Sequence, residues 1–355
     1  MYIGVLWDGI EKCCLIVTKL SVTKITTNFR EAVNVVDVPL TPPSDDQILL
    51  KNIYAGVNAT DVNITAARYF TDGKLPFDCG LEALGVIEAV GKNVTTHKVG
   101  QPAIVFGTVP KAYAEYLYAK PDEVIPIPSL KPEFIGLLVC GLTVTIGLDE
   151  VGRIKKGEKV LITASAGGTG HIGVQWAKQK GAYVIGMTSS DEKAKLLKEL
   201  GTDRVINYKT ENLDEVLTKE FPNGVDVIWE TIGGEVFKTL FKHLAPKGRL
   251  IIVGGISGYK GDGFPDVQIP HLNTTLLMKN QTLSGLLLTG YSDLFPKYLK
   301  QLVGDVVSNK LRVVLDFGQK SSEGEFNGID SVVRGVEHLQ SGRNTGKVVI
   351  KIQNP

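Results

Sequence analysis

Three glycines spaced three residues apart form the stretch whose residue types point most clearly to chemistry. Gly167, Gly170 and Gly173 follow the apolar run 160–162, and a segment able to form a helix begins among them. In this arrangement the first glycine permits a tight turn, the second lets the backbone approach a pyrophosphate, and the third lets the helix pack closely on the strand. The stretch therefore predicts a dinucleotide site at Gly167, Gly168 and Gly170, with the pyrophosphate on the helix N-terminus.

The end of the next predicted strand, residues 183–187, indicates which dinucleotide binds. An NAD site needs an Asp or Glu there, whereas an NADP site has small polar and basic residues around the extra phosphate. No acid stands at this strand end, and Ser189 and Lys193 follow it. A charge-assisted hydrogen bond from Lys193 would contribute ~1.5–3 kcal/mol. These residues favour NADPH; the alternative is that Ser190 and Asp191 only cap the next helix and Lys193 lies on a solvated face.

Two segments that would have to supply zinc ligands do not contain them. A catalytic zinc would need Cys or His near the glycines of residues 56–61 and 80–85, where the chain has Asn58 and Leu81. The four cysteines form no CxxC pair, and they are Cys13, Cys14, Cys79 and Cys140. We therefore expect chemistry without a metal, and we expect Cys79 and Cys140 to be small buried residues in a protein of a reducing compartment.

A glycine-rich turn, residues 254–259, follows the last strand predicted for the nucleotide-binding region. Loops at the carboxyl ends of parallel strands line the ligand crevice, so Tyr259 would present a phenol near a nicotinamide. The alternative is a surface aromatic in a glycine-rich loop. The five histidines show no partner pattern, and we predict no histidine base.

The pattern of predicted elements changes near residue 132. Before it, short apolar stretches separated by Gly and Pro indicate a β-rich domain, at residues 48–57, 85–90, 102–106 and 112–118. After it, apolar runs alternate with helical segments, which predicts a parallel sheet with helices on both faces. The helical segments are 132–151, 171–180, 191–200, 213–220 and 235–244, and the runs are 160–162, 183–187, 204–206, 225–229 and 249–253.

The C-terminal part returns to strand-like segments at 312–316 and 347–352, with a helix predicted at 328–339 between them. A strand that follows a complete nucleotide domain is expected to rejoin the first domain. We therefore expect one discontinuous domain, residues 1–140 with 305–355, and a nucleotide domain at 141–304.

The composition is that of a globular protein. The 355 residues are 43% hydrophobic and 22% charged, with a formal net charge of +1, which offers no basic field for nucleic acid. No stretch reaches the ~18 uninterrupted apolar residues of a transmembrane helix. The first fifteen residues contain Asp8 and Glu11 and resemble neither a transit peptide nor a good signal peptide. We expect a cytoplasmic protein without membrane insertion; a peroxisomal or mitochondrial location stays open.

These motifs together resemble the medium-chain dehydrogenase/reductase family, in its zinc-free branch of quinone oxidoreductases and prostaglandin reductases. The resemblance extends from about residue 19 to residue 351 and is specific at residues 28–33, 56–61, 166–170, 189–193, 207–210 and 344–349. Two features depart from the family pattern. Residues 260–265 replace a proline-rich loop common in prostaglandin reductases, and residues 22–27 make the start longer.

The resemblance implies a GroES-like β-rich domain beside a Rossmann-type doubly wound α/β domain, with a homodimer whose sheet continues across the two copies. It implies NADPH-dependent reduction of an activated carbon–carbon double bond, as in 15-oxo-prostaglandins and other enones. The cofactor contacts that it implies are Thr169, Ser189, Lys193, Tyr208, Thr231, Val253, Tyr259, Leu286, Leu287, Leu288 and Asn344. Lys193 and Tyr208 would contact the 2′-phosphate.

In the favoured mechanism a hydride reaches the β-carbon of the enone and negative charge develops on the carbonyl oxygen. A hydrogen bond from Tyr259 would stabilise that oxygen, and Asn58, Asn63 and Tyr69 would line the pocket. The alternatives are an NADPH quinone oxidoreductase and a non-catalytic NADPH-binding protein, either crystallin-like or RNA-binding. An enoyl-thioester reductase is less expected, because no basic cluster stands near Tyr259.

Overall fold

The computed structural model describes residues 15–106 and 109–354, and these form two compact units. The first unit comprises Met1–Val139 and Leu315–Pro355, and the second comprises Cys140–Val314. The predicted boundary at residues 304 and 305 falls inside helix α9 (Phe295–Val307) and is about ten residues early. The apolar face of α9 explains the difference, because Tyr298 and Leu302 are buried and the Tyr298 ring lies 6.2 Å from that of Trp176 in the second unit.

The first unit contains two sheets. A three-stranded sheet has the order β2 (Val33–Pro39), β1 (Ile16–Val22), β4 (Phe77–Asp78). The larger sheet has the order β15 (Leu315–Asp316), β16 (Lys347–Lys351), β3 (Ile48–Gly56), β5 (Glu82–Val90), β6 (Pro102–Phe106), β8 (Val124–Pro126), with β7 (Tyr116–Ala119) also paired to β3.

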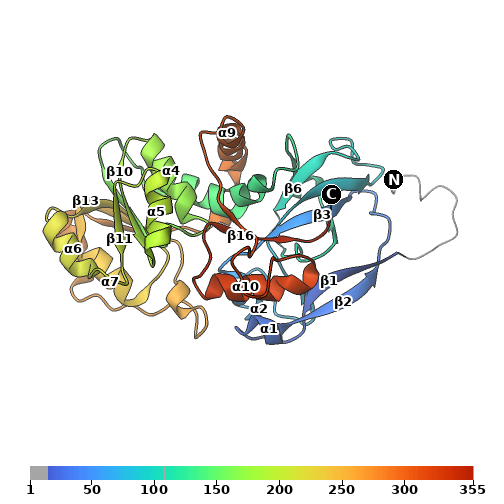
Figure 1. The fold of residues 1–355 in the computed structure, drawn as a ribbon, viewed down its shortest axis with the longest axis horizontal. Helices are drawn as coiled ribbons and strands as arrows, with labels where there is room; N and C mark the ends of the chain where they lie inside the picture. The colour runs from blue at the N-terminus through green and yellow to red at the C-terminus, as the bar shows by residue number, and fades with distance from the viewer. Residues whose placement is uncertain (1–14, 107–108, 355) are drawn as a thin grey trace. The chain divides into compact units, whose positions relative to one another are not determined.

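The C-terminal strand rejoins the first unit, as the sequence predicts. β16 pairs antiparallel with β3, with Val349 opposite Gly56 (Figure 1). The helix predicted before it is α10 (Val332–Gln340), which starts four residues later than expected, after a short 3₁₀ turn. Two shorter α-helices, α1 (Phe29–Ala32) and α2 (Asp61–Thr65), also belong to this unit.

The second unit is built on one parallel sheet of six strands. The order is β11 (Arg204–Asn207), β10 (Tyr183–Thr188), β9 (Lys159–Ile162), β12 (Val225–Glu230), β13 (Leu244–Ile252), β14 (Thr282–Gly285). Every pairing is parallel. This is the strand order of a doubly wound dinucleotide-binding sheet, with its switch point between β9 and β12. The predicted fold class is confirmed.

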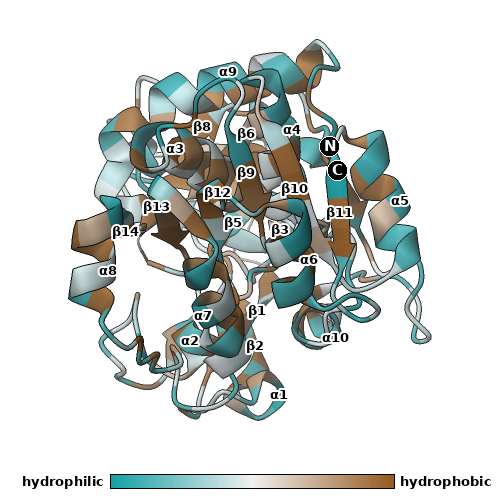
Figure 2. Ribbon diagram, turned by 90° about the vertical axis from the view of Figure 1, so that its left-hand side faces the viewer, coloured by the Kyte–Doolittle hydropathy of each residue, from teal (hydrophilic) through white to brown (hydrophobic). Residues whose placement is uncertain are grey.

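Helices cover the apolar strands of this sheet, and Figure 2 shows β9, β10 and β12 coloured as hydrophobic. One core contains Leu161, Ile185 and Ile228 and is completed by side chains of α6 (Leu213–Glu220), α7 (Gly234–Lys242) and α8 (Leu272–Lys279). α4 (Gly170–Gln179) lies against Ile162, whose side chain points to the other face because it is adjacent to Leu161 in the strand.

The helical segment Pro132–Val151 is long and apolar enough to cross a membrane by length and composition. However, 72% of its most apolar window is buried inside the folded chain, which is typical of a core helix. The segment is less regular than the single predicted helix. It consists of η3 (Pro132–Leu137), η4 (Leu138–Leu142), α3 (Thr143–Ile146) and η5 (Gly147–Val151), in which η4 and η5 are π-helical.

Candidate active site

The glycine stretch forms the turn between β9 and α4, and two of its glycines are required by close approach. A Cβ atom on Gly170 would lie 2.5 Å from the Ala164 carbonyl oxygen, so no side chain fits at the first residue of the helix. A Cβ atom on Gly173 would lie 2.6 Å from a methyl group of Val144. The third glycine is therefore needed for close packing, but mainly against helix α3, which carries Val144, whereas Ile162 of the predicted strand would lie 3.4 Å from the same Cβ atom.

The tight turn itself is made by another residue than predicted. Ala164 has φ of 45° and takes the left-handed conformation, whereas Gly167 is not among the residues with positive φ. The Gly167 N–H donates to the Ala164 carbonyl at 2.9 Å and closes the turn. Alanine carries no sequence signal for a left-handed conformation, so this position could not be found from the sequence.

Two hydroxyl groups that the sequence did not single out hold this turn on the neighbouring strands. The Ser165 hydroxyl donates to the Ile162 carbonyl at 2.6 Å and accepts from the Met187 N–H at 2.7 Å. The Thr163 hydroxyl accepts from the Thr231 N–H at 3.0 Å. The ends of β9, β10 and β12 are thereby joined to one another by hydrogen bonds next to the phosphate turn.

His171, in the first turn of α4, is a structural residue of this turn. Its Nδ1 lies 2.8 Å from the Gly167 carbonyl, and its Nε2 accepts from the Val314 N–H at 3.0 Å. The second contact requires an unprotonated Nε2, so Nδ1 carries the hydrogen and donates. This buried imidazole agrees with the expectation that no histidine acts as a base.

The residues predicted for the 2′-phosphate meet at the carboxyl ends of two adjacent strands. Ser189 follows β10 and Tyr208 follows β11, and the Tyr208 N–H donates to the Thr188 carbonyl at 3.1 Å. Lys193 lies in the first turn of α5 (Asp191–Glu199). Lys209, which is not among the predicted site residues, places its ammonium 5.7 Å from the centre of the exposed Tyr208 ring and adds a second cation to this edge.

The capping role considered for Ser190 and Asp191 is also observed. The Ser190 hydroxyl accepts from the Lys193 N–H at 3.3 Å, and the Asp191 carboxylate accepts from the Asn207 side chain at 2.9 Å. Both contacts use atoms other than the Lys193 ammonium. Capping and phosphate binding are therefore compatible at this helix N-terminus.

The remaining strand ends bring the other predicted cofactor residues to the same edge of the sheet. The Val253 N–H donates to the Glu230 carbonyl and the Leu286 N–H donates to the Ile252 carbonyl, both at 2.9 Å. Thr231 directly follows β12. Leu288 is buried, whereas Leu287 between these leucines is 62% exposed.

Glu230, at the end of β12, was not predicted as a functional residue. Its Oε1 accepts from the N–H groups of Ile232 and Gly233, at 2.7 and 2.9 Å, and so closes the turn that leads to α7. Its Oε2 is buried without a partner among the described residues. Burial raises the pKa of this carboxyl group.

Tyr259 is buried, at 5% exposure, which excludes the alternative of a surface aromatic. Its hydroxyl oxygen accepts from the Gly255 N–H at 3.3 Å, and its ring lies 5.6 Å from that of Phe264. The loop that carries it is tied to the turn after β12, because the Ile256 N–H donates to the Thr231 carbonyl at 3.0 Å. The phenol therefore lies at the carboxyl edge of the sheet, inside its own loop.

The first unit contains the residues predicted for the substrate pocket. Asn63 donates to the Tyr69 hydroxyl at 3.0 Å, and the Thr60 hydroxyl is a second hydrogen-bonding partner of that phenol. Arg68 donates to Asn63 at 2.7 Å. Burial raises the pKa of Tyr69, which keeps its proton at neutral pH.

Asn58 has a different role from the one predicted. Its side-chain oxygen accepts from Lys347 at 2.8 Å, and its Nδ2 donates to Glu82 at 3.0 Å. The residue is 5% exposed. We therefore remove Asn58 from the substrate pocket, because both ends of its amide are used inside the protein. Asn344 holds its own turn in this unit, with Nδ2 donating to the Gly346 carbonyl at 3.1 Å.

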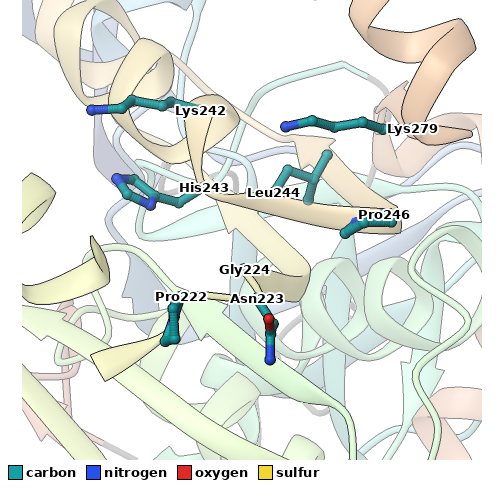
Figure 3. Close-up of a pocket in the computed structure, with 8 residues that line it drawn as sticks. All are labelled: Pro222, Asn223, Gly224, Lys242, His243, Leu244, Pro246 and Lys279. Atoms are coloured by element: carbon teal, nitrogen blue, oxygen red, sulfur yellow. The ribbon is translucent and has the colours of Figure 1, made fainter. Parts of the chain in front are cut away.

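The cavity in Figure 3 does not belong to the predicted site. It has a volume of about 340 Å³ and is lined by residues around the amino ends of β12 and β13, among them Gly224, Lys242, His243 and Lys279. Parallel strands place these ends opposite the cofactor edge. Lys242 and His243 are paired with Asp214, at 2.8 and 2.6 Å. Nothing in this cavity indicates a ligand.

The donor set of the second unit fits a phosphorylated dinucleotide. Gly170 begins α4, whose N-terminus can bind a pyrophosphate, and hydroxyl and ammonium groups lie at the ends of β10 and β11. The described side chains do not offer a comparable set of ligands for a metal ion. Within residues 15–106 and 109–354 there is no group of three His, Cys, Asp or Glu side chains that could hold one.

Comparison with family models gives two matches that follow the two units. Residues 44–129 match the alcohol dehydrogenase GroES-like domain, and residues 168–304 match a family described as zinc-binding dehydrogenase. The first match lies in the β-rich unit and the second begins at the phosphate turn.

Individual relatives cover nearly the whole chain. Prostaglandin reductase-3 of Mus musculus is 41% identical over 95% of this chain and 90% of the relative. A probable quinone oxidoreductase of Leishmania amazonensis is 40% identical over 94% of this chain and 98% of the relative. The solved structure of Escherichia coli quinone oxidoreductase complexed with NADPH has a TM-score of 0.82 at 25% identity, covering 94% of this chain and 99% of that chain.

Proposed function

Since the chain belongs to the medium-chain dehydrogenase/reductase family, in its branch of quinone oxidoreductases and prostaglandin reductases, we propose that it reduces the activated carbon–carbon double bond of enones. It is an NADP-dependent oxidoreductase. NADPH, when bound, supplies the hydride for the β-carbon. We take 15-oxo-prostaglandins as representative substrates, because Prostaglandin reductase-3 is similar to this chain over 95% of its length.

The observation that carries the proposal is the cofactor edge of the parallel sheet. The glycine turn leads into the N-terminus of α4, which favours binding of a phosphate, and Ser189, Lys193 and Tyr208 follow the ends of the second and third strands of the nucleotide fold. No carboxylate occupies the position that would bind an unphosphorylated ribose. We assign Lys193 and Tyr208 to the 2′-phosphate and Thr169 to the pyrophosphate.

The residues of the chain have two further tasks in this proposal. Tyr259, held in its loop at the same edge, donates a hydrogen bond to the carbonyl oxygen of the enone as negative charge develops there. Asn63 and Tyr69, joined by a hydrogen bond of 3.0 Å, line the substrate pocket. Solvent supplies the proton for the α-carbon.

The test is a comparison of NADPH oxidation with a 15-oxo-prostaglandin, an alkenal, a simple quinone and an enoyl thioester. The proposal predicts that an enone gives the highest kcat/KM. A highest value with the quinone would favour the second candidate, an NADPH quinone oxidoreductase, which the Leishmania relative supports. NADPH binding without turnover of any of the four would contradict both.

We also propose a homodimer formed through strand β14. This strand lies at the edge of the sheet, and within the described part of the chain it pairs with β13 alone. Exposed apolar side chains flank it in the sequence: Leu277 and Met278 of the preceding helix α8 are each 75% exposed, and Leu287, two residues after the strand, is 62% exposed. An unpaired edge with such side chains is a template for a second copy. Sedimentation should give twice the chain mass, and Leu287→Asp should shift it toward the monomer; a wild-type monomer would contradict the proposal.

We further propose a cytoplasmic location. Among the described residues Cys79 and Cys140 are buried and lie outside any disulfide, which agrees with a reducing compartment. Cys13 and Cys14 lie outside the described residues. Imaging of a fluorescent fusion against peroxisomal and mitochondrial markers tests this, and co-localisation with either marker would contradict it.

A further inference from the structure

The first unit contains a cluster of five buried polar side chains that the proposed chemistry does not use. Asn58, Asp61, Glu82, Tyr113 and Lys347 are each between 0 and 5% exposed, and we call them the buried polar cluster. They come from the end of β3, the start of α2, the start of β5, the loop before β7 and the start of β16. No two of these segments except the first two are close in the sequence.

An ion pair forms one half of the cluster. The Lys347 ammonium contacts the Glu82 carboxylate and donates to the Asn58 side chain at 2.8 Å and to the Val57 carbonyl at 3.0 Å. Glu82 also accepts from the Asn58 Nδ2 at 3.0 Å and from the Val139 N–H at 2.9 Å. Asn58 is therefore held from both ends of its amide by the two members of the pair.

Asp61 forms the other half. Its Oδ2 accepts from the Asn58 N–H at 2.8 Å and from the Tyr113 hydroxyl at 2.5 Å. Its Oδ1 is buried without a partner among the described residues. The turn from Asn58 to Asp61 is thus held in two ways. The ion pair binds the side-chain amide of Asn58, and the Asp61 carboxylate accepts from the main-chain N–H of Asn58.

The stability of the fold does not explain the cluster. Removing two charges from water costs several kcal/mol per ion, and a buried ion pair can often be replaced by apolar residues without loss of stability. The packing is also demanding, because a Cβ atom on Gly56 would lie 2.4 Å from a Glu82 oxygen. Such a cluster is expected where an exact position matters more than stability.

The turn that the cluster fixes leads directly into the predicted pocket residues. Asp61 is the first residue of α2, and Asn63 in the same helix donates to the Tyr69 hydroxyl at 3.0 Å. The loop after α2 is strained, since Ala67 and Phe70 have φ of 53° and 64° although neither is glycine. A strained loop keeps its conformation only when the neighbouring structure holds it.

We infer that the buried polar cluster is a positioning device, in which Lys347 and Glu82 hold Asn58 and the start of α2 so that Asn63 and Tyr69 meet the substrate correctly. The inference rests on the proposed function, because it takes Asn63 and Tyr69 as pocket residues. Lys347, Glu82 and Asn58 are positioning residues and do not contact substrate themselves.

Two variants test this. Asn58→Ala leaves the ion pair intact and disconnects it from the turn, and the double variant Lys347→Met with Glu82→Gln removes both charges together, which avoids an unpaired buried charge. In each we expect kcat/KM for the enone to fall at least about tenfold, with the Kd for NADPH unchanged because the cofactor cradle belongs to the other unit. Replacing the partly exposed pair Lys19 and Asp78 of the same unit by Met and Asn is the matched control, expected to stay within about twofold of the wild type.

Hydrogen exchange gives a readout that needs no turnover. Amides of residues 58–66 should exchange faster in both variants, whereas those of residues 160–173 should not change. A folded variant with wild-type kcat/KM, or wild-type exchange at residues 58–66, would overturn the inference. Absence of enone and quinone turnover in the wild type would instead contradict the proposed function, and the exchange experiment would still decide whether the cluster fixes the turn.

Discussion

Replacing Asp61 by Asn should remove a pH-dependent stability cost from the first unit. Burial raises the pKa of Asp61 from 3.8 to about 7, against the opposing effects of the hydrogen bonds from Tyr113 and the Asn58 N–H and of the Lys347 charge. Asn keeps an oxygen that accepts both hydrogen bonds, and its NH₂ group takes the place of the unpartnered Oδ1. The variant therefore resembles the protonated carboxyl group at every pH.

The sign follows from where the proton is held. Between pH 3.8 and about 7 the folded protein binds a proton that the unfolded chain has lost, so the free energy of unfolding falls as the pH rises through this window. Above pH 7 the full cost is present. With 1.36 kcal/mol for each pKa unit, the cost grows from roughly 1.5–2 kcal/mol at pH 5 to about 4 kcal/mol at pH 8. The wild type should therefore lose about 2–3 kcal/mol relative to Asp61→Asn over this range.

Urea unfolding of both proteins at pH 5, 6, 7 and 8, followed by circular dichroism, measures this difference. The comparison of the two proteins cancels the contributions of all other titrating groups. Asp37→Asn, which changes an exposed carboxylate on β2 of the same unit, is the control and should reproduce the wild-type pH dependence. Parallel curves for wild type and Asp61→Asn, within about 0.5 kcal/mol, would refute the raised pKa and the reasoning from burial.

Three further substitutions test the cofactor edge. Lys193→Ala should weaken NADPH binding about ten- to a hundredfold and NADH binding little, because it removes a charge-assisted hydrogen bond. Fluorescence titration measures both dissociation constants, and Lys195→Ala on the same helix is the control. Equal losses for the two cofactors would contradict the 2′-phosphate assignment. Gly170→Ala should destabilise the fold by about 1–3 kcal/mol and impair NADPH binding, because its Cβ has no space. Gly304→Ala, at an open helical position, should instead stabilise it by about 0.5–1 kcal/mol. Tyr259→Phe should lower kcat for the enone about a hundredfold, and an unchanged kcat would remove Tyr259 from the mechanism.

Much of the nucleotide-binding unit could be predicted because its signals are local. The run before Gly167 becomes β9, and the helix predicted at residues 171–180 is α4 with a start one residue earlier. Apolar runs typical of buried strands alternate along the chain with segments whose apolar residues recur at helical spacing. A parallel sheet covered by helices on both faces buries the apolar residues of both. The residues at the strand ends follow from the topology once the strands are known.

Other parts depend on contacts that sequence spacing does not reveal. The sequence predicts the end of the nucleotide unit at residue 304 instead of 314, because α9 has the pattern of any amphipathic helix, and its contact with Trp176 is what shows to which unit it belongs. Ala164 adopts a left-handed conformation because Ser165 and Thr163 fix the surrounding turn, which no propensity of alanine indicates.

The sequence by itself determined the class of fold, the phosphate turn and the preference for NADPH, since each follows from local patterns: the order of apolar runs and helical segments, and the residues directly after single strands. The tertiary structure alone decided the role of Asn58. Lys347 lies 289 positions away from it, and the sequence gives no reason to pair them. Their contact exists because β16 returns to pair with β3 and brings an ammonium group into the interior, where it must meet a carboxylate and an amide to be buried at all.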